Sequence, residues 1–481
     1  MNDLCPTVLV NPGIVQAGPV AQKVFPPIGL MYLVAALKQA GLPVRLIDAN
    51  ATGEDDDAVV SRLQAMQPLA VGLPVFDITL VQTARLARAI RAGFPRVILF
   101  AGGPAATVDP ARTIAMIPEI DYVLAGEAEE SIVRFVRGLR AGEVPSGIPG
   151  LFAAGHNLPD DHPPQPARIL DLQAIPLPDR ECVRENYEAR RYYTVLVPDR
   201  HIDCVVTSRG CPHRCAFCYN WRFRQAYRSP DSCLEEFEML RARGVTTIEI
   251  LDDNFTTDRD RAMTILESVA AMRMPVRFRI KARADAIDEG LMKAARRAGV
   301  YQVSIGAESG SPEMLCRMKK RLTPDVTARA VETVMKSGAY CHTSFIVGFP
   351  GETRQTMDDT VKMIKAVRPT SVSIDVLAPY QGTSVYEMAK ADGTLQGDWS
   401  ASPGDPLPWI RLDWTTTRKD LEDARKAMLF RVYFNLRYMT RYAAMIIGGM
   451  NPTMGRYLVQ EAIATLPGAR GLPAEHQKGN E

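Results

Sequence analysis

Short apolar runs alternate with longer amphipathic segments along the first 142 residues. The runs are TVLVNP, VRLIDA, LAVGLPVF, VILFAGG and DYVLAGE, and their continuous hydrophobicity is typical of strands buried on both faces of a parallel sheet. Between them, segments such as GLMYLVAALKQAG and TLVQTARLARAIRAG have helical periodicity, and each ends in a glycine that suits a helix C-terminus. Residues 1–142 are therefore predicted to form a doubly wound α/β domain, with a ligand at the carboxyl ends of its strands.

The pattern changes after residue 142 and again after residue 200. Residues 143–200 are dense in proline, as in VPSGIPG, LPDDHPPQP and IPLPDR, which predicts a linker with one small hairpin. Residues 201–390 return to alternating strand-like and helix-like segments, and six such units predict a partial, open (βα)6 barrel whose chemistry lies at the carboxyl ends of its strands. Residues 391–481 are predicted to be a mostly helical extension, with one helix near 417–446.

Composition and charge narrow the function classes. The 481 residues carry 57 basic and 55 acidic side chains, a formal net charge of +2, which gives no electrostatic argument for a nucleic-acid partner. We find neither a basic leader nor an uninterrupted apolar run long enough for a membrane span, so we expect a cytoplasmic protein. Nine scattered cysteines in a chain of this length indicate a reducing compartment rather than a disulfide framework.

Three of the nine cysteines lie within eight residues, in GCPHRCAFCYNW directly after the first predicted barrel strand. Cys211, Cys215 and Cys218 can supply thiolates to three irons of a [4Fe–4S] cluster, which leaves the fourth iron open to a substrate or cosubstrate. The competing hypothesis is a Cys₃His zinc site that includes His213, but all four ligands would then have to converge from one tight loop.

The motif CPHRCAFCYNW resembles the CxxxCxxC signature of the radical S-adenosylmethionine (radical SAM) superfamily, and the resemblance extends over about residues 201–380. It implies that the open iron chelates the amino and carboxylate groups of S-adenosylmethionine (SAM). Electron transfer from the cluster then yields a 5′-deoxyadenosyl radical that abstracts a hydrogen atom. The resemblance also implies an electron donor such as flavodoxin or ferredoxin.

Later strand ends, TIEILDDNFTTD, RIKARAD, IGAESGS and FIVGFPGET, resemble the same superfamily. On this basis Glu308 is expected to accept from a SAM ribose hydroxyl or the ammonium group, and Arg283 to pair with the carboxylate. Asp252 and Asp253 are further candidates at a strand end, and Tyr219 is expected to place its carbonyl near adenine. A local salt bridge, a helix cap or simple packing is the alternative role at each position.

The N-terminal domain resembles the flavodoxin-like Rossmann domain of the cobalamin-binding class in PPIGLMYLVAALKQAG, AGGPAAT and LAGEAEES. Gly102, Gly103 and Gly126 are expected to let the backbone approach a large flat cofactor, although glycine turns occur in any sheet of this kind.

One departure from the cobalamin-domain pattern bears on the metal. Many such domains carry Asp-x-His-x-x-Gly, in which the His ligates cobalt, but DANATG places Asn50 at that position. An amide is a poor cobalt ligand, so we expect cobalamin without a His ligand from the protein. The lower face of the corrin is expected to pack against Val75, Phe76 and Thr79.

Together these features predict a cobalamin-dependent radical SAM methyltransferase that acts on an unactivated carbon of a small, lipid-like or tetrapyrrole substrate. A lipid-like substrate would place the protein at a membrane surface. The first alternative is a cyclase or rearrangement enzyme without methyl transfer, because CYNWRFRQAYR resembles the oxygen-independent ring cyclase of bacteriochlorophyll synthesis. The second is a tRNA methylthiotransferase, disfavoured because only Cys5 precedes residue 182. The third is a non-enzymatic cofactor-binding module.

Overall fold

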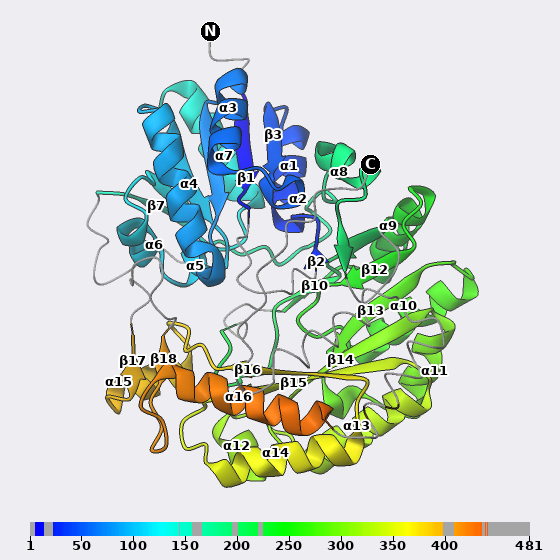
Figure 1. Cartoon of the computed structure of the whole chain (residues 1–481). Coiled ribbons are helices and arrows are strands. Elements are labelled where there is room, and N and C mark those ends of the chain that lie inside the picture. Colours follow the sequence, from blue (N-terminus) through cyan, green and yellow to red (C-terminus); the bar gives the residue numbers. More distant parts are fainter. Residues whose placement is uncertain are drawn as a thin grey trace.

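The computed structural model contains two six-stranded sheets, one mostly and one wholly parallel, whose strand ends point toward a shared cavity (Figure 1). It describes residues 5–13, 23–143, 145–155, 166–194, 201–219, 225–397, 408–434, 438 and 440. Within these residues, no helix is both long and apolar enough to cross a bilayer.

The first sheet has the strand order β3-β1-β4-β5-β6-β7. Its five parallel strands coincide with the five predicted apolar runs, and β7 pairs antiparallel to β6. This last strand comes from the proline-rich segment, whose predicted small hairpin is replaced by strands that pair with other parts of the chain. The strands are β1 (Thr7–Asn11), β3 (Val44–Asp48), β4 (Ala70–Pro74), β5 (Ile98–Gly102), β6 (Tyr122–Leu124) and β7 (Leu151–Ala153).

Helices cover both faces of the first sheet, as a doubly wound fold requires. One face packs against α1 and α7, and the other against α3, α4, α5 and α6. Asp55 begins α3 by accepting a hydrogen bond from the Ala58 backbone N–H at 2.9 Å. The helices are α1 (Ile28–Gln39), α2 (Ala49–Thr52), α3 (Asp56–Met66), α4 (Leu80–Gly93), α5 (Pro104–Val108), α6 (Pro110–Met116) and α7 (Glu129–Ala141).

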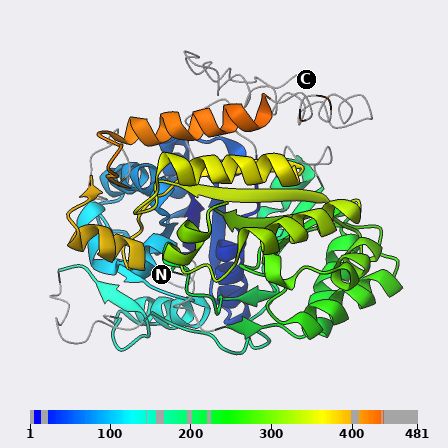
Figure 2. The same cartoon turned by 90° about the horizontal axis from the view of Figure 1, so that it is seen from below.

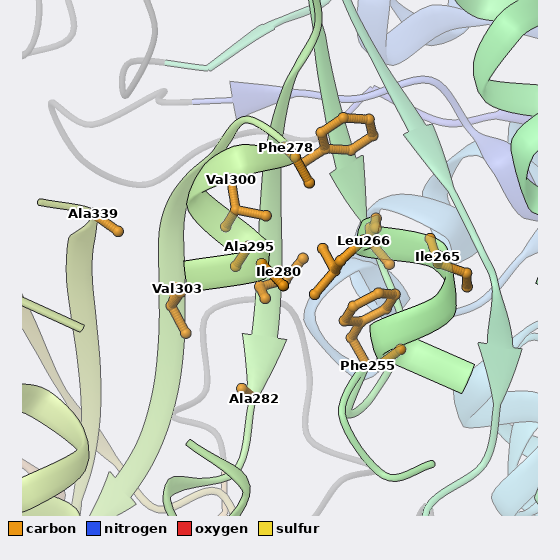
Figure 3. Packing of buried hydrophobic residues seen from close by; sticks show 14 of the residues in the cluster. Phe255, Ile265, Leu266, Phe278, Ile280, Ala282, Ala295, Val300, Val303 and Ala339 are labelled. Carbon is orange, nitrogen blue, oxygen red and sulfur yellow. The ribbon is translucent and has the colours of Figure 1, made fainter. Parts of the chain in front are cut away.

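The second sheet is an open six-stranded parallel sheet in the order β16-β15-β14-β13-β12-β9, which confirms the predicted barrel. Alternate residues of β13 face outward, and Figure 3 shows Leu266 of α10 beside Ile280 of that strand. The strands are β9 (Ile202–Val205), β12 (Thr247–Ile250), β13 (Arg277–Ala282), β14 (Val300–Glu308), β15 (Tyr340–Val347) and β16 (Ser371–Val376). The helices are α9 (Pro230–Ala242), α10 (Arg259–Ala271), α11 (Glu289–Arg297), α12 (Pro312–Arg317), α13 (Pro324–Lys336), α14 (Arg354–Val367) and α15 (Ser384–Ala391).

The segment 166–194 joins the two halves through buried polar contacts. The Arg180 guanidinium forms ion pairs with Asp203 at 2.8 Å and with Glu236 at 2.7 Å, and all three side chains are almost fully buried. The Tyr192 hydroxyl donates to Asp48 of the first sheet at 2.8 Å. The segment also contains η2 (Glu181–Val183), α8 (Arg184–Glu188) and β8 (Tyr193–Thr194), which pairs with β2 (Lys23–Val24).

The C-terminal extension packs along the last strand of the barrel. Helix α16 (Arg418–Tyr433) lies beside α14 in both views (Figures 1 and 2). The Tyr433 hydroxyl donates to the Val372 carbonyl at 2.7 Å and accepts from the Val372 N–H at 3.0 Å. This contact agrees with a packing role for the helix. Most of the predicted helix beyond residue 434 lies outside the described residues.

Candidate functional site

A cavity of about 570 Å³ lies where the carboxyl ends of the two sheets meet. Asn11, Pro74, Gly102 and Leu124 line it from the ends of four strands of the first sheet. From the barrel it is lined by residues that follow β9 and β12, and by two residues that flank the cysteine loop. These are Val206, Leu251, Asp253, Gly210 and Tyr219.

The cavity wall is mainly apolar but carries one ionic cluster. Arg209 of β10 (Ser208–Arg209) pairs with Glu129 at 2.6 Å and with Glu127 at 3.3 Å, and its guanidinium lies 5.2 Å from the Tyr32 ring centroid. These contacts tie the barrel to the first domain. The second carboxylate oxygen of Glu129, Oε2, is buried and has no hydrogen-bond partner among the described residues. A corrin ring bears carboxamide N–H donors, so this acceptor and the apolar walls fit cobalamin.

The predicted cobalamin residues divide into two groups. Phe76, Gly102, Gly103 and Gly126 line the cavity, and 44% of the Phe76 surface is exposed. Val75, Thr79 and Asn50 do not line the cavity. Val75 donates its backbone N–H to Gly102 at 2.8 Å, and the Thr79 hydroxyl bonds to the Phe76 backbone at 3.3 Å. Packing of these residues against a corrin stays a prediction.

Asp48, two residues before Asn50, is engaged within the protein. Its carboxylate accepts from Asn11 Nδ2 at 2.7 Å and from the Tyr192 hydroxyl at 2.8 Å, and it begins α2 by accepting from the Ala51 N–H at 3.2 Å. Burial raises the pKa of this carboxyl, while the hydrogen bonds lower it. Asp48 therefore orients Asn11, which lines the cavity.

The cavity glycines are explained by contacts within the protein. Gly103 and Gly126 both have φ of +95°, a conformation that disfavours any side chain. A Cβ on Gly126 would lie 2.3 Å from the Ala167 carbonyl oxygen, and one on Gly103 would lie 3.0 Å from that of Val75. Close packing of neighbouring backbone thus requires these glycines, whether or not they also allow approach of a cofactor.

Gly126→Ala is expected to lower the free energy of unfolding by about 3 kcal/mol, since it combines a left-handed backbone with a clash against fixed backbone atoms. The matched control is Gly142→Ala, where φ is +71° but nothing lies within 4 Å of the added Cβ. The control substitution should lower the free energy of unfolding by about 1 kcal/mol. Urea denaturation of both variants measures the difference, and equal losses would show that the close approach to Ala167 is unimportant.

The cysteine loop is held from two sides. Cys215 and Cys218 close a turn in which the Cys218 N–H donates to the Cys215 carbonyl at 3.1 Å. Between them, the Ala216 N–H donates to Met318 at 2.9 Å, and the Ala216 carbonyl accepts from Val385 at 2.9 Å. Burial raises the pKa of the Cys211 and Cys215 thiols, and the nearby Lys320 ammonium acts in the opposite direction.

The zinc alternative requires four ligands that converge on one point. Among the residues that the structure describes, no three His, Cys, Asp or Glu side chains gather around one point where a metal ion could bind. A Cys₃His zinc site would need such convergence. Cysteines that hold an iron–sulfur cube each bind a different iron, so their sulfurs stand further apart. The donor set of three thiols from one loop fits that arrangement.

The two predicted aspartates after β12 differ in their surroundings. Asp252 is buried and accepts from the Thr207 N–H at 2.6 Å, from the Thr207 hydroxyl at 2.5 Å and from the Ser208 hydroxyl at 2.6 Å. It therefore fixes the segment after β9, a local role. Asp253 lines the cavity together with Tyr219 and lies close enough to Cys211 to raise its pKa, after the larger effect of burial.

Arg283 and Glu308 both contact the turn at Lys320. Arg283 donates to the backbone carbonyls of Lys320 and Arg321 and pairs with Asp285 at 3.0 Å. Glu308 pairs with Lys320 Nζ at 2.7 Å. Lys320 Nζ lies 6.0 Å from the ring centroid of Phe217 in the cysteine loop, so the structure places both side chains near the loop. Each of these side chains already has a protein partner. Their binding of SAM is a proposal.

Glu352 is a buried residue that sequence reasoning missed. It follows β15 in GFPGE and accepts from the Gly348 N–H at 2.5 Å, which fixes a turn in which Gly348 and Gly351 have φ of +96° and +81°. Burial raises the pKa of its carboxyl from 4.5 to about 7. The sequence signal that could have identified Glu352 is an acidic residue directly after Gly-Phe-Pro-Gly.

Glu352→Gln is expected to change the pH dependence of stability. Between 4.5 and about 7 the unfolded carboxyl has lost its proton and the folded one keeps it, so the wild-type protein loses stability as pH rises through this window. The amide does not titrate. The stability of the wild type relative to the variant should therefore fall by about 3 kcal/mol across the window. Urea denaturation at a series of pH values tests this, and a constant difference would contradict it.

Comparisons with known proteins agree with this geometry. The family model described as the radical SAM superfamily matches residues 205–364, and the B12 binding domain model matches residues 18–136. An uncharacterised methyltransferase of Pyrococcus horikoshii is 30% identical over 374 residues, which cover 77% of this chain and 80% of that protein. The anaerobic magnesium-protoporphyrin IX monomethyl ester cyclase of Rubrivivax gelatinosus is 23% identical over 76% of this chain and 66% of its own length.

A solved structure shares the fold across both sheets. The cobalamin-dependent SAM radical enzyme OxsB, with aqua-cobalamin and SAM bound, superposes with a TM-score of 0.73 over 96% of this chain and 72% of its own, at 17% identity. The B12 binding domain model precedes the radical SAM model along the chain, as the predicted fold class requires. The chain belongs to the radical SAM superfamily, among the enzymes that combine the barrel with a B12-binding domain and use a [4Fe–4S] cluster, SAM and cobalamin.

Proposed function

We propose that this chain methylates an unactivated carbon of a small, lipid-like or tetrapyrrole substrate. The observation that carries the proposal is the shared cavity, which is lined by strand ends of the B12-binding domain and by Gly210 and Tyr219 on either side of the cysteine loop. A substrate bound there would be within reach of both cofactor sites. The similarity to a methyltransferase over 77% of the chain supports the same reaction class.

In this proposal the three cysteines would ligate three irons of the cluster. Asp253, Arg283, Glu308 and Tyr219 would orient SAM around the loop. When bound, the cluster and SAM supply one-electron chemistry at carbon, and cobalamin supplies a methyl carrier. The mainly apolar walls would exclude water, which protects reactive carbon centres from side reactions.

Phe76 is the aromatic side chain that we propose to flank the corrin. It is unusual in being large, apolar and 44% exposed while lining the cavity from the first domain. Gly102, Gly103 and Gly126 would border the cofactor through their backbone. Asn50 lies outside the cavity lining. Because an amide is a poor cobalt ligand, cobalamin would bind without a His ligand from this position.

The second candidate is ring formation without methyl transfer. It is supported by the similarity to the anaerobic cyclase over 76% of the chain. Both candidates need the same cofactors and the same cavity. The products into which SAM is converted therefore distinguish the two reactions.

The proposed function is tested by anaerobic reconstitution with iron, sulfide and hydroxocobalamin, followed by turnover with SAM and a low-potential reductant. A methyltransferase should retain cobalamin through gel filtration and release S-adenosylhomocysteine, and a methylated product gains one CH₂ in mass. A cyclase should release 5′-deoxyadenosine without S-adenosylhomocysteine. Protein that keeps no cobalamin would contradict both candidates.

A further inference from the structure

A second hollow, of about 500 Å³, lies behind the cysteine loop and shares no lining residue with the cavity between the sheets. Its apolar part comes from Pro312, Leu315, Leu322 and Val326 of α12, α13 and the turn between them. Lys319 and Arg321 also line it, and both side chains are exposed. The hollow thus combines an apolar floor with two cations at solvent.

The backbone conformation at residues 319–321 places three consecutive basic residues in different environments. Lys319 and Arg321 have φ of +52° and +54°, which non-glycine residues rarely adopt. Arg283 holds this conformation by donating to the Lys320 and Arg321 carbonyls. Lys320 is consequently buried against Glu308, while its two neighbours face solvent. The buried guanidinium of Arg283 therefore stabilises a backbone conformation in which Lys319 and Arg321 lie at the surface.

Neither exposed cation is neutralised by the part of the protein that the structure describes. Lys319 and Arg321 form no side-chain hydrogen bond or ion pair with described residues, whereas Asp285 of the same hollow is paired with Arg283 at 3.0 Å. The lining of the hollow therefore carries excess positive charge, which attracts acidic proteins over about 8 Å at physiological ionic strength.

The hollow abuts the predicted cluster ligands. Met318, directly before Lys319, accepts the hydrogen bond from Ala216, which lies between Cys215 and Cys218. Lys320 Nζ lies 6.0 Å from the ring centroid of Phe217 in the same loop. A partner seated in the hollow would lie beside Met318, which contacts the loop, and it would leave the cavity between the sheets free for substrate.

We propose that this hollow is the docking surface for a small acidic one-electron carrier, of the flavodoxin or ferredoxin class. The inference rests on the proposed function, because it requires a cluster at the cysteine loop. In the encounter, one electron leaves the reduced carrier and enters the cluster. The carrier dissociates oxidised by one electron, and no bond is made or broken.

The test compares two double variants of the full chain. Lys319→Glu/Arg321→Glu reverses the charges at the hollow. Arg190→Glu/Arg273→Glu is the matched control, because both arginines are exposed and also have positive φ, of 51° and 48°, but do not line the hollow. Both variants make the same change in net charge.

Two readouts are measured with reduced flavodoxin as the probe. Surface plasmon resonance should give a Kd at least about tenfold weaker for the hollow variant at low salt, with a smaller salt dependence, and little change for the control. Stopped-flow reduction of the reconstituted cluster by flavodoxin should slow by a similar factor, while reduction by dithionite is unchanged.

Equal effects of the two variants on Kd would overturn the docking surface and leave the proposed function intact. Slower reduction by both flavodoxin and dithionite would also overturn it, since the defect would then lie in the cluster. Failure of the wild-type chain to assemble a cluster would overturn the proposed function, and the docking proposal with it.

Discussion

Cys215→Ala is expected to abolish assembly of the [4Fe–4S] cluster and to reduce reductive cleavage of SAM by about three orders of magnitude or more. The side chain is only 8% exposed and belongs to a loop fixed at Ala216 from two directions, so no other residue can move in to replace the thiolate. Iron and sulfide analysis measures assembly, and 5′-deoxyadenosine release measures cleavage.

Cys316→Ala serves as the control for general loss of a thiol, because Cys316 is exposed on α12 and lies outside the loop. It should reconstitute as the wild type does. Both variants should bind hydroxocobalamin normally, since the B12-binding domain is a separate sheet. A Cys215→Ala protein with full iron content and turnover would contradict the assignment of the loop as the cluster site.

Arg180→Met is expected to lower the free energy of unfolding by about 4 kcal/mol. The substitution keeps a long apolar side chain but leaves the Asp203 carboxylate buried without its cation. It also removes one of the two arginines that pair with Glu236, the other being Arg228. Removing one partner of a buried ion pair costs more free energy than the intact pair contributes to stability, because the remaining charge is buried and cannot reach water.

Chemical denaturation of Arg180→Met should be compared with Arg184→Met, four residues along the same segment. Arg184 is 63% exposed, and its pairs with Glu181 and Glu188 are at the surface, so its replacement should cost less than about 1 kcal/mol. Similar losses in the two variants would show that burial does not decide the strength of these ion pairs.

The sheet architecture was predictable because parallel strands buried on both faces must be apolar throughout. Each of the five early runs forms a strand of the first sheet. The pairing of β7 with the first sheet was not predicted, because this strand has only three residues within a proline-rich segment where we expected a separate hairpin. Short edge strands leave too little apolar sequence to be recognised.

The site was predictable where a motif dictates the chemistry and less so where geometry decides. The cysteine loop follows β9 as its spacing required. Neighbouring residues at a strand end face opposite directions, so only one of Asp252 and Asp253 can face the cavity. The sequence does not show which of the two it is. The network of Arg180, Asp203 and Glu236 joins residues 23 and 56 positions apart, and such pairing has no local signal.

The contacts of Tyr433 and Arg180 also have a consequence for self-association. An open sheet ends in two edge strands, here β16 and β9, whose free backbone groups invite strands from other molecules. Tyr433 occupies both backbone groups of Val372 on β16, and Arg180 donates to the Cys204 carbonyl of β9 at 3.0 Å. The proline-rich segment and α16, which contribute no predicted cofactor residue, therefore block strand addition at both borders of the barrel.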